Sequence, residues 1–215
     1  MIEIKFRGRG GQGAVVASEI LGRAFFLEGK YPQCFSLFGG ERRGAPVVGF
    51  LRVDEQPILL KCQIYHPDQM IIFDFSLIDE MEILKELKPS GLILINTNRE
   101  IDSFKKLRTF KMGLINAGPI ARSVGLGDTF NTVMLGAYVR LTHLVRLETL
   151  IEAIKTMVPS KVEAILKQPV RLINRRKYMK QQEISETVEK SRERKIVFQS
   201  SQKDRAIENG FRSFL

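Results

Sequence analysis

The chain has 215 residues, of which 44% are hydrophobic, so it is long enough to bury one hydrophobic core and too apolar to be disordered throughout. The formal net charge is +10, and residues 171–215 hold 12 of the 34 basic but only 6 of the 24 acidic residues. The two cysteines, Cys34 and Cys62, are too few to ligate an iron–sulfur cluster or to define a secreted disulfide scaffold, and no metal site is predicted.

The first predicted elements are a strand, a loop and a helix. Residues 2–6 alternate between apolar and charged side chains, which is the pattern of a strand. A glycine-rich loop at 8–13 interrupts this pattern, and residues 14–28 then carry apolar side chains at helical spacing up to Gly29. We find no cleavable signal and no apolar stretch of about 20 residues, so we expect a cytoplasmic protein that does not contact a membrane.

The following elements alternate strands and helices. Residues 31–46 have an irregular pattern, and Gly118-Pro119 indicates a break. Strands are predicted at 47–53, 57–60 or 57–62, 70–73, 92–95 and 111–116, and helices at 78–87, 120–124, 129–144 and 147–157. Because near-continuous apolar strands alternate with helices, we predict an α/β fold of three layers with a mostly parallel sheet and a Rossmann-like first strand, loop and helix.

The composition changes near residue 170. We expect one domain over residues 1–170, followed at 171–215 by a basic C-terminal tail that is polar and partly helical. Its charge excess and weak apolar pattern favour an interaction segment that orders on binding a partner.

The glycine-rich loop is the first candidate site. Gly8, Gly10 and Gly13 fit the pattern G-x-G-x-x-G between a strand and a helix. Glycines let the backbone turn tightly and let a phosphate approach, and the following helix offers free N–H groups and a positive dipole end. The candidate anion-binding residues of this loop are Gly8, Arg9, Gly10, Gly11, Gln12 and Gly13.

Three interpretations of this loop remain open. A dinucleotide site needs an acidic residue about 20 positions after the last glycine, where this chain has Gln33, Cys34 and Phe35. Asp74 ends a strand but lies much later in the chain. Binding of a phosphate or another anion is therefore favoured over a dinucleotide site, and the glycines could instead only permit a tight strand-to-helix turn.

A second loop, at residues 39–46, places Arg42 and Arg43 between glycines. Because the planar guanidinium of arginine suits phosphate bidentately, the pair is a second candidate anion site. The alternative is a surface loop whose arginines pair with acidic groups such as Glu41, or with another subunit.

Three motifs together resemble one family. Residues 8–14, Gly-Arg-Gly-Gly-Gln-Gly-Ala, are similar to the opening motif of the gamma subunits of pyruvate- and 2-ketoisovalerate:ferredoxin oxidoreductases. Residues 38–47 resemble their second signature, with Gly40 where the family usually has proline, and residues 131–137, Asn-Thr-Val-Met-Leu-Gly-Ala, resemble their third. The likeness extends over residues 1–157, and three linked motifs are far more specific than a lone glycine fingerprint.

This resemblance implies a subunit without catalytic residues of its own. In the family, the complex decarboxylates a 2-oxoacid on thiamine diphosphate and magnesium held by partner subunits. Electrons pass through 4Fe–4S clusters on partners to ferredoxin, and the acyl group is transferred to coenzyme A. The resemblance implies partners of the alpha, beta and delta types for a gamma-type domain at 1–170. It also implies coenzyme A binding at the glycine loop, with Arg42, Arg43 and Asn131 as further candidate contacts.

Two other functions are weighed against this one. A free-standing nucleotide-dependent Rossmann oxidoreductase is the main alternative, and the missing ribose acid argues against it. A nucleic-acid-binding module that uses the tail is disfavoured, because the aromatic residues of that segment are scattered and no nucleic-acid motif is present.

Overall fold

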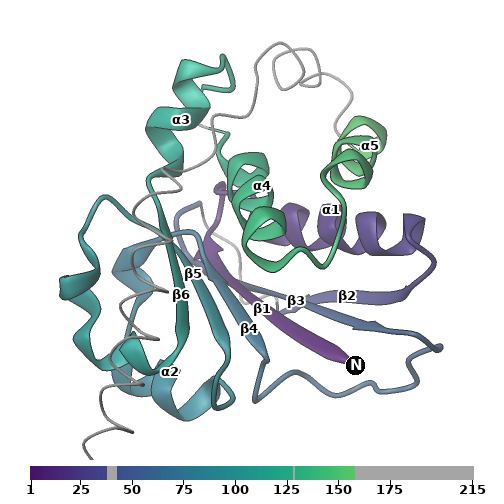
Figure 1. Cartoon of the computed structure of the whole chain (residues 1–215), viewed down its shortest axis with the longest axis horizontal. Helices are drawn as coiled ribbons and strands as arrows, with labels where there is room; N and C mark the ends of the chain where they lie inside the picture. The colour runs from purple at the N-terminus through teal and green to yellow at the C-terminus, as the bar shows by residue number, and fades with distance from the viewer. Residues whose placement is uncertain (38–42, 128, 158–215) are drawn as a thin grey trace, which may run out of the picture. The chain divides into compact units, whose positions relative to one another are not determined.

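The structure is a computed structural model that describes residues 1–37, 43–127 and 129–157. Six strands form one sheet in the order β2-β3-β1-β4-β5-β6 (Figure 1). Their bounds are β1 Ile2–Arg9, β2 Tyr31–Leu37, β3 Pro46–Asp54, β4 Gln69–Ile72, β5 Leu92–Asn96 and β6 Lys111–Ile115. Strands β1, β4, β5 and β6 pair in parallel, whereas β3 is antiparallel to both β1 and β2.

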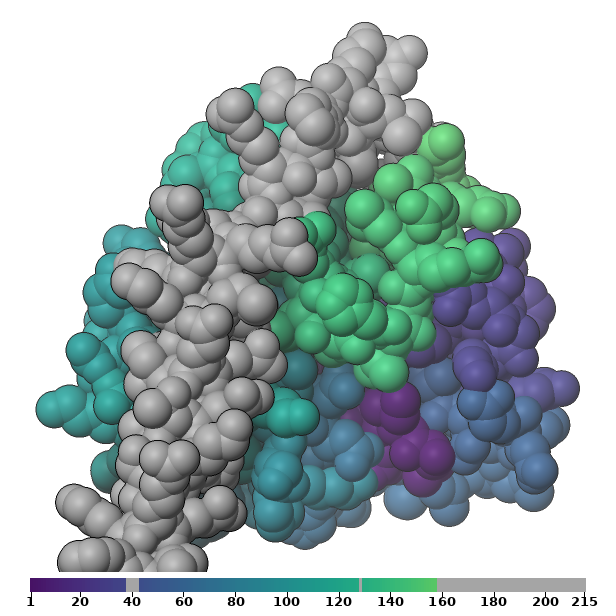
Figure 2. Space-filling view, in the orientation of Figure 1, coloured from purple at the N-terminus to yellow at the C-terminus, as the bar shows by residue number. Residues whose placement is uncertain are grey.

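Helices cover both faces of the sheet. The α-helices are α1 Ala14–Leu27, α2 Glu80–Glu86, α3 Ala117–Ser123, α4 Asn131–Thr142 and α5 Leu147–Met157, and two 3-10 helices are η1 Phe75–Leu77 and η2 Ile101–Thr109. Helix α1 packs on β1, β2 and β3 and contacts α4 and α5, which lie on the same side of the sheet in Figure 1. Figure 2 shows α4 and α5, in greens, as one continuous surface beside α1. Helix α2 and η2 lie on the opposite side, which confirms the predicted three-layer α/β fold with a mostly parallel sheet.

The two faces of β1 differ in polarity. Ile4 and Phe6 are completely buried in the core beneath α1. On the other face, Lys5 pairs with Glu86 at 2.7 Å and Arg7 with Glu82 at 2.8 Å. The two glutamates are one helical turn apart on α2, so this helix is held over β1 by ion pairs. Over β4 and β5, α2 instead buries apolar side chains in a second core cluster, which includes Met70, Ile72, Ile83, Leu87, Ile93 and Ile95.

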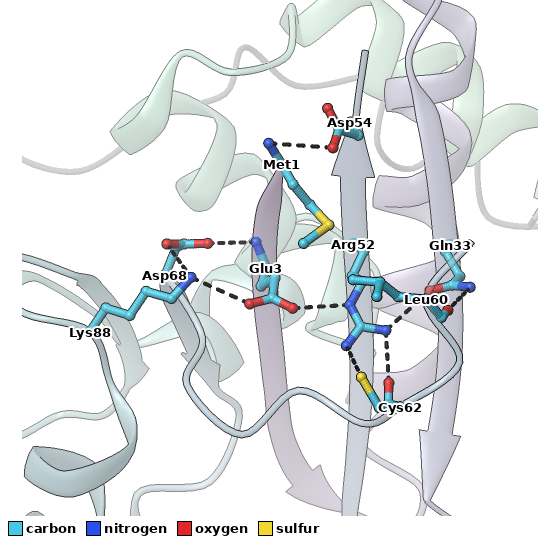
Figure 3. Close-up of polar contacts among 9 residues, drawn as sticks. All are labelled: Met1, Glu3, Gln33, Arg52, Asp54, Leu60, Cys62, Asp68 and Lys88. Atoms are coloured by element: carbon cyan, nitrogen blue, oxygen red, sulfur yellow. Dashed lines mark hydrogen bonds and ion pairs between the residues drawn. The ribbon is translucent and has the colours of Figure 1, made fainter. Parts of the chain in front are cut away.

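A polar network lies at the amino-terminal edge of the parallel strands (Figure 3). The side chain of Arg52 on β3 is only 2% exposed, and its guanidinium donates to Glu3 at 3.0 Å and to the carbonyl of Cys62 at 2.7 Å. Glu3 also accepts from Lys88 at 3.3 Å, and its backbone N–H donates to Asp68 at 2.8 Å. The network joins β1, β3 and the segments before β4 and β5. The buried guanidinium of Arg52 therefore helps to hold these elements together.

Two predictions for residues 31–62 were wrong. Residues 31–37 form β2, an edge strand in which Pro32 is tolerated because an edge strand pairs on one side only. The strand predicted at 57–60 or 57–62 is not formed. In that segment the carbonyls of Leu60 and Cys62 accept hydrogen bonds from the side chains of Gln33 and Arg52, in place of a neighbouring strand.

The break predicted at Gly118-Pro119 was also wrong. Both residues lie in the first turn of α3, where the missing N–H of proline costs nothing because the first N–H groups of a helix have no intrahelical partner. The domain boundary near residue 170 and the basic tail lie outside the described residues.

Candidate functional site

The carboxyl ends of β1 and β4 form a topological switch point. The two strands are parallel neighbours, but the chain leaves β1 through α1 on one face and leaves β4 towards α2 on the other. In open α/β sheets, ligands bind in the crevice that such a divergence leaves at the carboxyl ends of the strands. The glycine loop follows β1 at this point, and Asp74 follows the end of β4. The fold therefore places the loop where a ligand site is expected.

Three glycines of the loop have different structural roles. A Cβ on Gly8 would lie 2.9 Å from the Cβ of Ala14, so only glycine lets the start of α1 pack this closely on the strand end. Gly10 exchanges backbone hydrogen bonds with the second loop, donating to the Ala45 carbonyl at 2.8 Å and accepting from the Gly44 N–H at 3.1 Å. Gly11 has a φ of +93°, is exposed, and has no atom within 4 Å of the position where a Cβ would lie. An approaching group can therefore reach the backbone at Gly11.

The start of α1 is open for an acceptor. Gly13 is the N-cap residue, with a φ of 75°, and no side chain caps the helix. The N–H of Ala17 is the first to bond within the helix, to the Gly13 carbonyl at 2.9 Å. The N–H groups of Ala14, Val15 and Val16 therefore lack intrahelical partners, and the dipole of α1 places partial positive charge beside them. Such a terminus suits an anion.

Asn131 joins the third motif to the glycine loop. It is the first residue of α4 and is only 6% exposed, and its Oδ1 accepts from the Thr132 N–H at 2.9 Å. Its Nδ2 lies 2.6 Å from the position that a Cβ on Gly13 would occupy. This Nδ2 has no hydrogen-bond partner among the residues that the structure describes, so it is a donor next to the open end of α1.

Arg9 and Gln12 are engaged with Asp74. The guanidinium of Arg9 donates to Asp74 at 3.1 Å, to the Gly44 carbonyl at 3.1 Å and to the Ser76 hydroxyl at 2.9 Å. Gln12 accepts from the Arg9 backbone N–H at 2.8 Å and donates to Asp74 at 2.9 Å. The side chains of the loop therefore hold the loop itself, and the open donors beside it are backbone N–H groups and Asn131.

The pKa of Asp74 is lowered by these partners. Partial burial acts to raise it, but hydrogen bonds from the Ser76 hydroxyl and N–H and from Gln12, together with the positive charge of Arg9, outweigh burial. The carboxylate therefore stays ionised at neutral pH.

The second predicted loop lies beside the first but is only partly described. Arg43 is exposed, next to Gly44, whose backbone bonds Gly10. Arg42 lies outside the described residues. The structure thus brings together the loop at 8–13, Asn131 and the end of the second signature, which are far apart in the sequence.

Two hollows of the described surface lie at the opposite edge of the sheet. An open cavity of about 540 Å³ is lined by His66, Lys88 and Phe110 among others, and one of about 350 Å³ lies beside it. Lys88, which lines both, is already neutralised by Asp68 at 2.9 Å and Glu3 at 3.3 Å. The N–H groups without intrahelical partners at the start of α1 lie at the carboxyl edge, and we place the candidate site there.

Comparison with known proteins decides the family. Residues 3–175 match the family described as pyruvate ferredoxin/flavodoxin oxidoreductase. The chain belongs to this family. The pyruvate/ketoisovalerate oxidoreductases common subunit gamma of Thermococcus litoralis is 48% identical over 159 residues, which cover 72% of this chain and 85% of that protein. The pyruvate synthase subunit PorC of Methanothermobacter marburgensis is 44% identical over 162 residues, 75% of this chain and 89% of that protein.

A solved member of the family has the same fold. The pyruvate oxidoreductase subunit PORC from Thermotoga maritima superposes with a TM-score of 0.65 at 32% identity, covering 76% of this chain and 89% of that one. The resemblance seen in the three motifs is confirmed, and the free-standing Rossmann oxidoreductase has no support from these comparisons. Within the described ranges of this family member, no helix has the length and hydropathy needed to cross a membrane.

Asp74 is the residue at this site that sequence reasoning undervalued. A ribose-binding acid is normally sought at the end of the second strand, but here the β2–β3 pair is inserted on the other side of β1. Strand β4 is therefore the parallel neighbour of β1, and its terminal acid lies beside the glycine loop. The signal in the sequence was an aspartate at the end of a buried strand. Only the strand order shows that this strand lies next to β1.

Proposed function

We propose that the chain is the gamma-type subunit of a 2-oxoacid:ferredoxin oxidoreductase. The complex would decarboxylate pyruvate or a related 2-oxoacid oxidatively, reduce ferredoxin and release acyl-coenzyme A. The family membership and relatives that are gamma and PorC subunits support this role. With two cysteines the chain cannot supply four thiolates to a 4Fe–4S cluster, so the clusters belong on partner subunits. The resemblance to the gamma subunits implies that thiamine diphosphate and magnesium also belong on partners, which would be of the alpha, beta and delta types. A cytoplasmic location is part of the proposal, since coenzyme A and ferredoxin react there.

The contribution of this chain is to hold coenzyme A by its diphosphate at the start of α1. The observation that carries this proposal is an uncapped 14-residue helix behind an open glycine at the switch point. The residues fit an anion: the N–H groups of residues 14–16 converge there, Gly11 leaves room for close approach, and the Nδ2 of Asn131 is a free donor among the described residues. Arg43 and Arg42 of the adjoining loop are the cations assigned to the same ligand.

Gly11→Ala tests this site. The Cβ would occupy the space through which a phosphate approaches, so the apparent KM for coenzyme A of the assembled complex should rise roughly tenfold, while the KM for the 2-oxoacid stays within about twofold. Gly29→Ala is the matched control: Gly29 also has a positive φ, +80°, and open space around its Cβ position, but it follows α1 at the opposite end.

The control separates backbone strain from obstruction. Both substitutions force alanine into a left-handed conformation and should lower stability alike. A coenzyme A KM that is unchanged by Gly11→Ala, or raised equally by Gly29→Ala, would remove the glycine loop from the binding site and leave it as a strand-to-helix turn.

A further inference from the structure

The carboxylate of Asp74 bonds both the glycine loop after β1 and the segment after β4. Its Oδ2 accepts from Arg9 and Gln12, and its Oδ1 accepts from the Ser76 N–H at 3.0 Å and hydroxyl at 2.7 Å. The side chain is 19% exposed. The carboxylate, at the end of β4, is therefore a fixed point to which the loop after β1 is attached by two side chains.

The attachment extends to a third segment. Besides Asp74 and Ser76, the Arg9 guanidinium donates to the Gly44 carbonyl, and Gly44 donates its N–H to Gly10. All three guanidinium nitrogens of Arg9 thus have acceptors within the protein. Only the Nε bonds Asp74, so turning the whole guanidinium towards a ligand would leave the Asp74 carboxylate, 19% exposed, without its cationic partner.

We propose that Asp74 is the positioning residue of the anion site, acting through a clamp formed by Asp74, Arg9 and Gln12. The clamp fixes the glycine loop against β4 and the second signature, so that the N–H groups at the start of α1 are preorganised before the ligand arrives. The inference rests on the proposed function, and it assigns Arg9 to holding the loop and the backbone to holding the phosphate.

The direction in which Asp74→Asn changes the KM for coenzyme A distinguishes the clamp from direct binding of the ligand by Arg9. Asp74→Asn keeps the shape of the side chain but removes the charge that holds Arg9. If Arg9 positions the loop, Asp74→Asn and Arg9→Gln should each raise the KM for coenzyme A of the assembled complex roughly tenfold. The double variant should cost no more than the larger single effect, because both substitutions break one unit. The KM for the 2-oxoacid should not change.

A KM for coenzyme A that does not rise in Asp74→Asn overturns the proposal. If Arg9 bound the phosphate itself, Asp74→Asn would free it, and the KM for coenzyme A would fall or stay unchanged while Arg9→Gln raised it. Asp79→Asn is the matched control, because Asp79 also accepts backbone N–H groups, at 2.9 and 3.2 Å, but caps α2 and has no contact with the loop among the described residues. It should leave both constants unchanged.

Hydrogen exchange supplies a second readout that does not depend on activity. In the full chain, Asp74→Asn and Gln12→Ala should accelerate amide exchange in residues 8–13, where the N–H groups of Arg9, Gly10 and Gln12 are bonded, and Asp79→Asn should not. Unchanged exchange in that peptide would overturn the clamp even for a variant that fails to assemble. If Gly11→Ala raises the coenzyme A KM and Asp74→Asn does not, the clamp is wrong and the proposed function stands. If Gly11→Ala has no effect, the binding site itself is wrong.

Discussion

At the scale of single residues, Gly22 shows how close packing limits side-chain size in this fold. It lies in the middle of α1, is buried, and an added Cβ would meet the Sγ of Cys34 on β2 at 2.5 Å. Cys34 is an exposed residue of the edge strand, but its thiol turns towards α1 and lies 3.4 Å from the Ser18 carbonyl. Desolvation of the thiol in that position, aided by the negative charge of Glu19, raises its pKa to about 12, so it remains protonated. The pair sets the distance between α1 and the edge strand.

Gly22→Ala should therefore destabilise the protein, although the same substitution normally stabilises a helix by about 1 kcal/mol. We expect a loss of about 1–3 kcal/mol in the free energy of unfolding, measured by denaturant titration. Gly136→Ala in α4 is the matched control, because nothing lies within 4 Å of its Cβ position, and it should stabilise. In a Cys34→Ala background Gly22→Ala should become stabilising. Loss of stability there would show that the thiol is not the obstacle.

At the scale of elements, a buried ion pair links β1 to its neighbour β3. Glu3 is 14% and Arg52 2% exposed in their side chains, so the pair that links β1 to β3 at 3.0 Å is almost fully desolvated. Breaking such a pair leaves a buried charge without compensation, which costs far more than losing an exposed pair.

Glu3→Gln is expected to lower the free energy of unfolding by about 3 kcal/mol, because the Arg52 guanidinium then keeps only neutral acceptors. Glu55→Gln is the control: Glu55 pairs with Lys30 but is 74% exposed, and its loss should cost less than about 0.5 kcal/mol. The double variant Glu3→Gln with Arg52→Met should recover part of the loss, since neither charge remains buried. Equal urea midpoints for Glu3→Gln and the control would contradict this account.

At the scale of the whole molecule, the described residues contain a sheet with helices on both faces. Within residues 1–37, 43–127 and 129–157, the six-stranded sheet is covered by helices on both faces, and the last described helix is α5. The start of α5 is held at the end of α1, because Glu28, the residue after α1, accepts the N–H of Arg146, the residue before α5, at 2.8 Å. The core residues named above on β1, β4, β5 and α2 all precede that point.

We therefore expect that a chain truncated after residue 170 folds but assembles poorly. Residues 171–215 carry twice as many basic as acidic side chains, 12 against 6, which suits an acidic surface on a partner subunit. Circular dichroism and thermal unfolding should be nearly unchanged, whereas co-purification with partner subunits should weaken. Replacing Arg175, Arg176 and Lys177 by glutamine in the full chain should reproduce part of that weakening. A truncated chain that does not fold would place the tail within the domain.

Much of the fold could be predicted because local patterns and burial agree. The apolar strands at 70–73 and 92–95 appear within one residue of their predicted bounds, and the helix predicted at 147–157 is α5. Prediction failed where backbone partners come from distant residues. Strand β2 exists because β3 pairs with it, and the segment at 57–62 is not a strand because the side chains of Gln33 and Arg52 occupy its carbonyls.

The sequence by itself determined the family and the candidate loop, because three short motifs and a glycine spacing are local properties of the chain. Only the tertiary structure decided what those residues do to one another. The strand order makes β4 the neighbour of β1, so Asp74, 65 positions from Arg9, reaches its guanidinium, and Asn131 reaches Gly13 across two helix starts. Spacing along a chain cannot encode such contacts, because they depend on which strands the sheet places side by side.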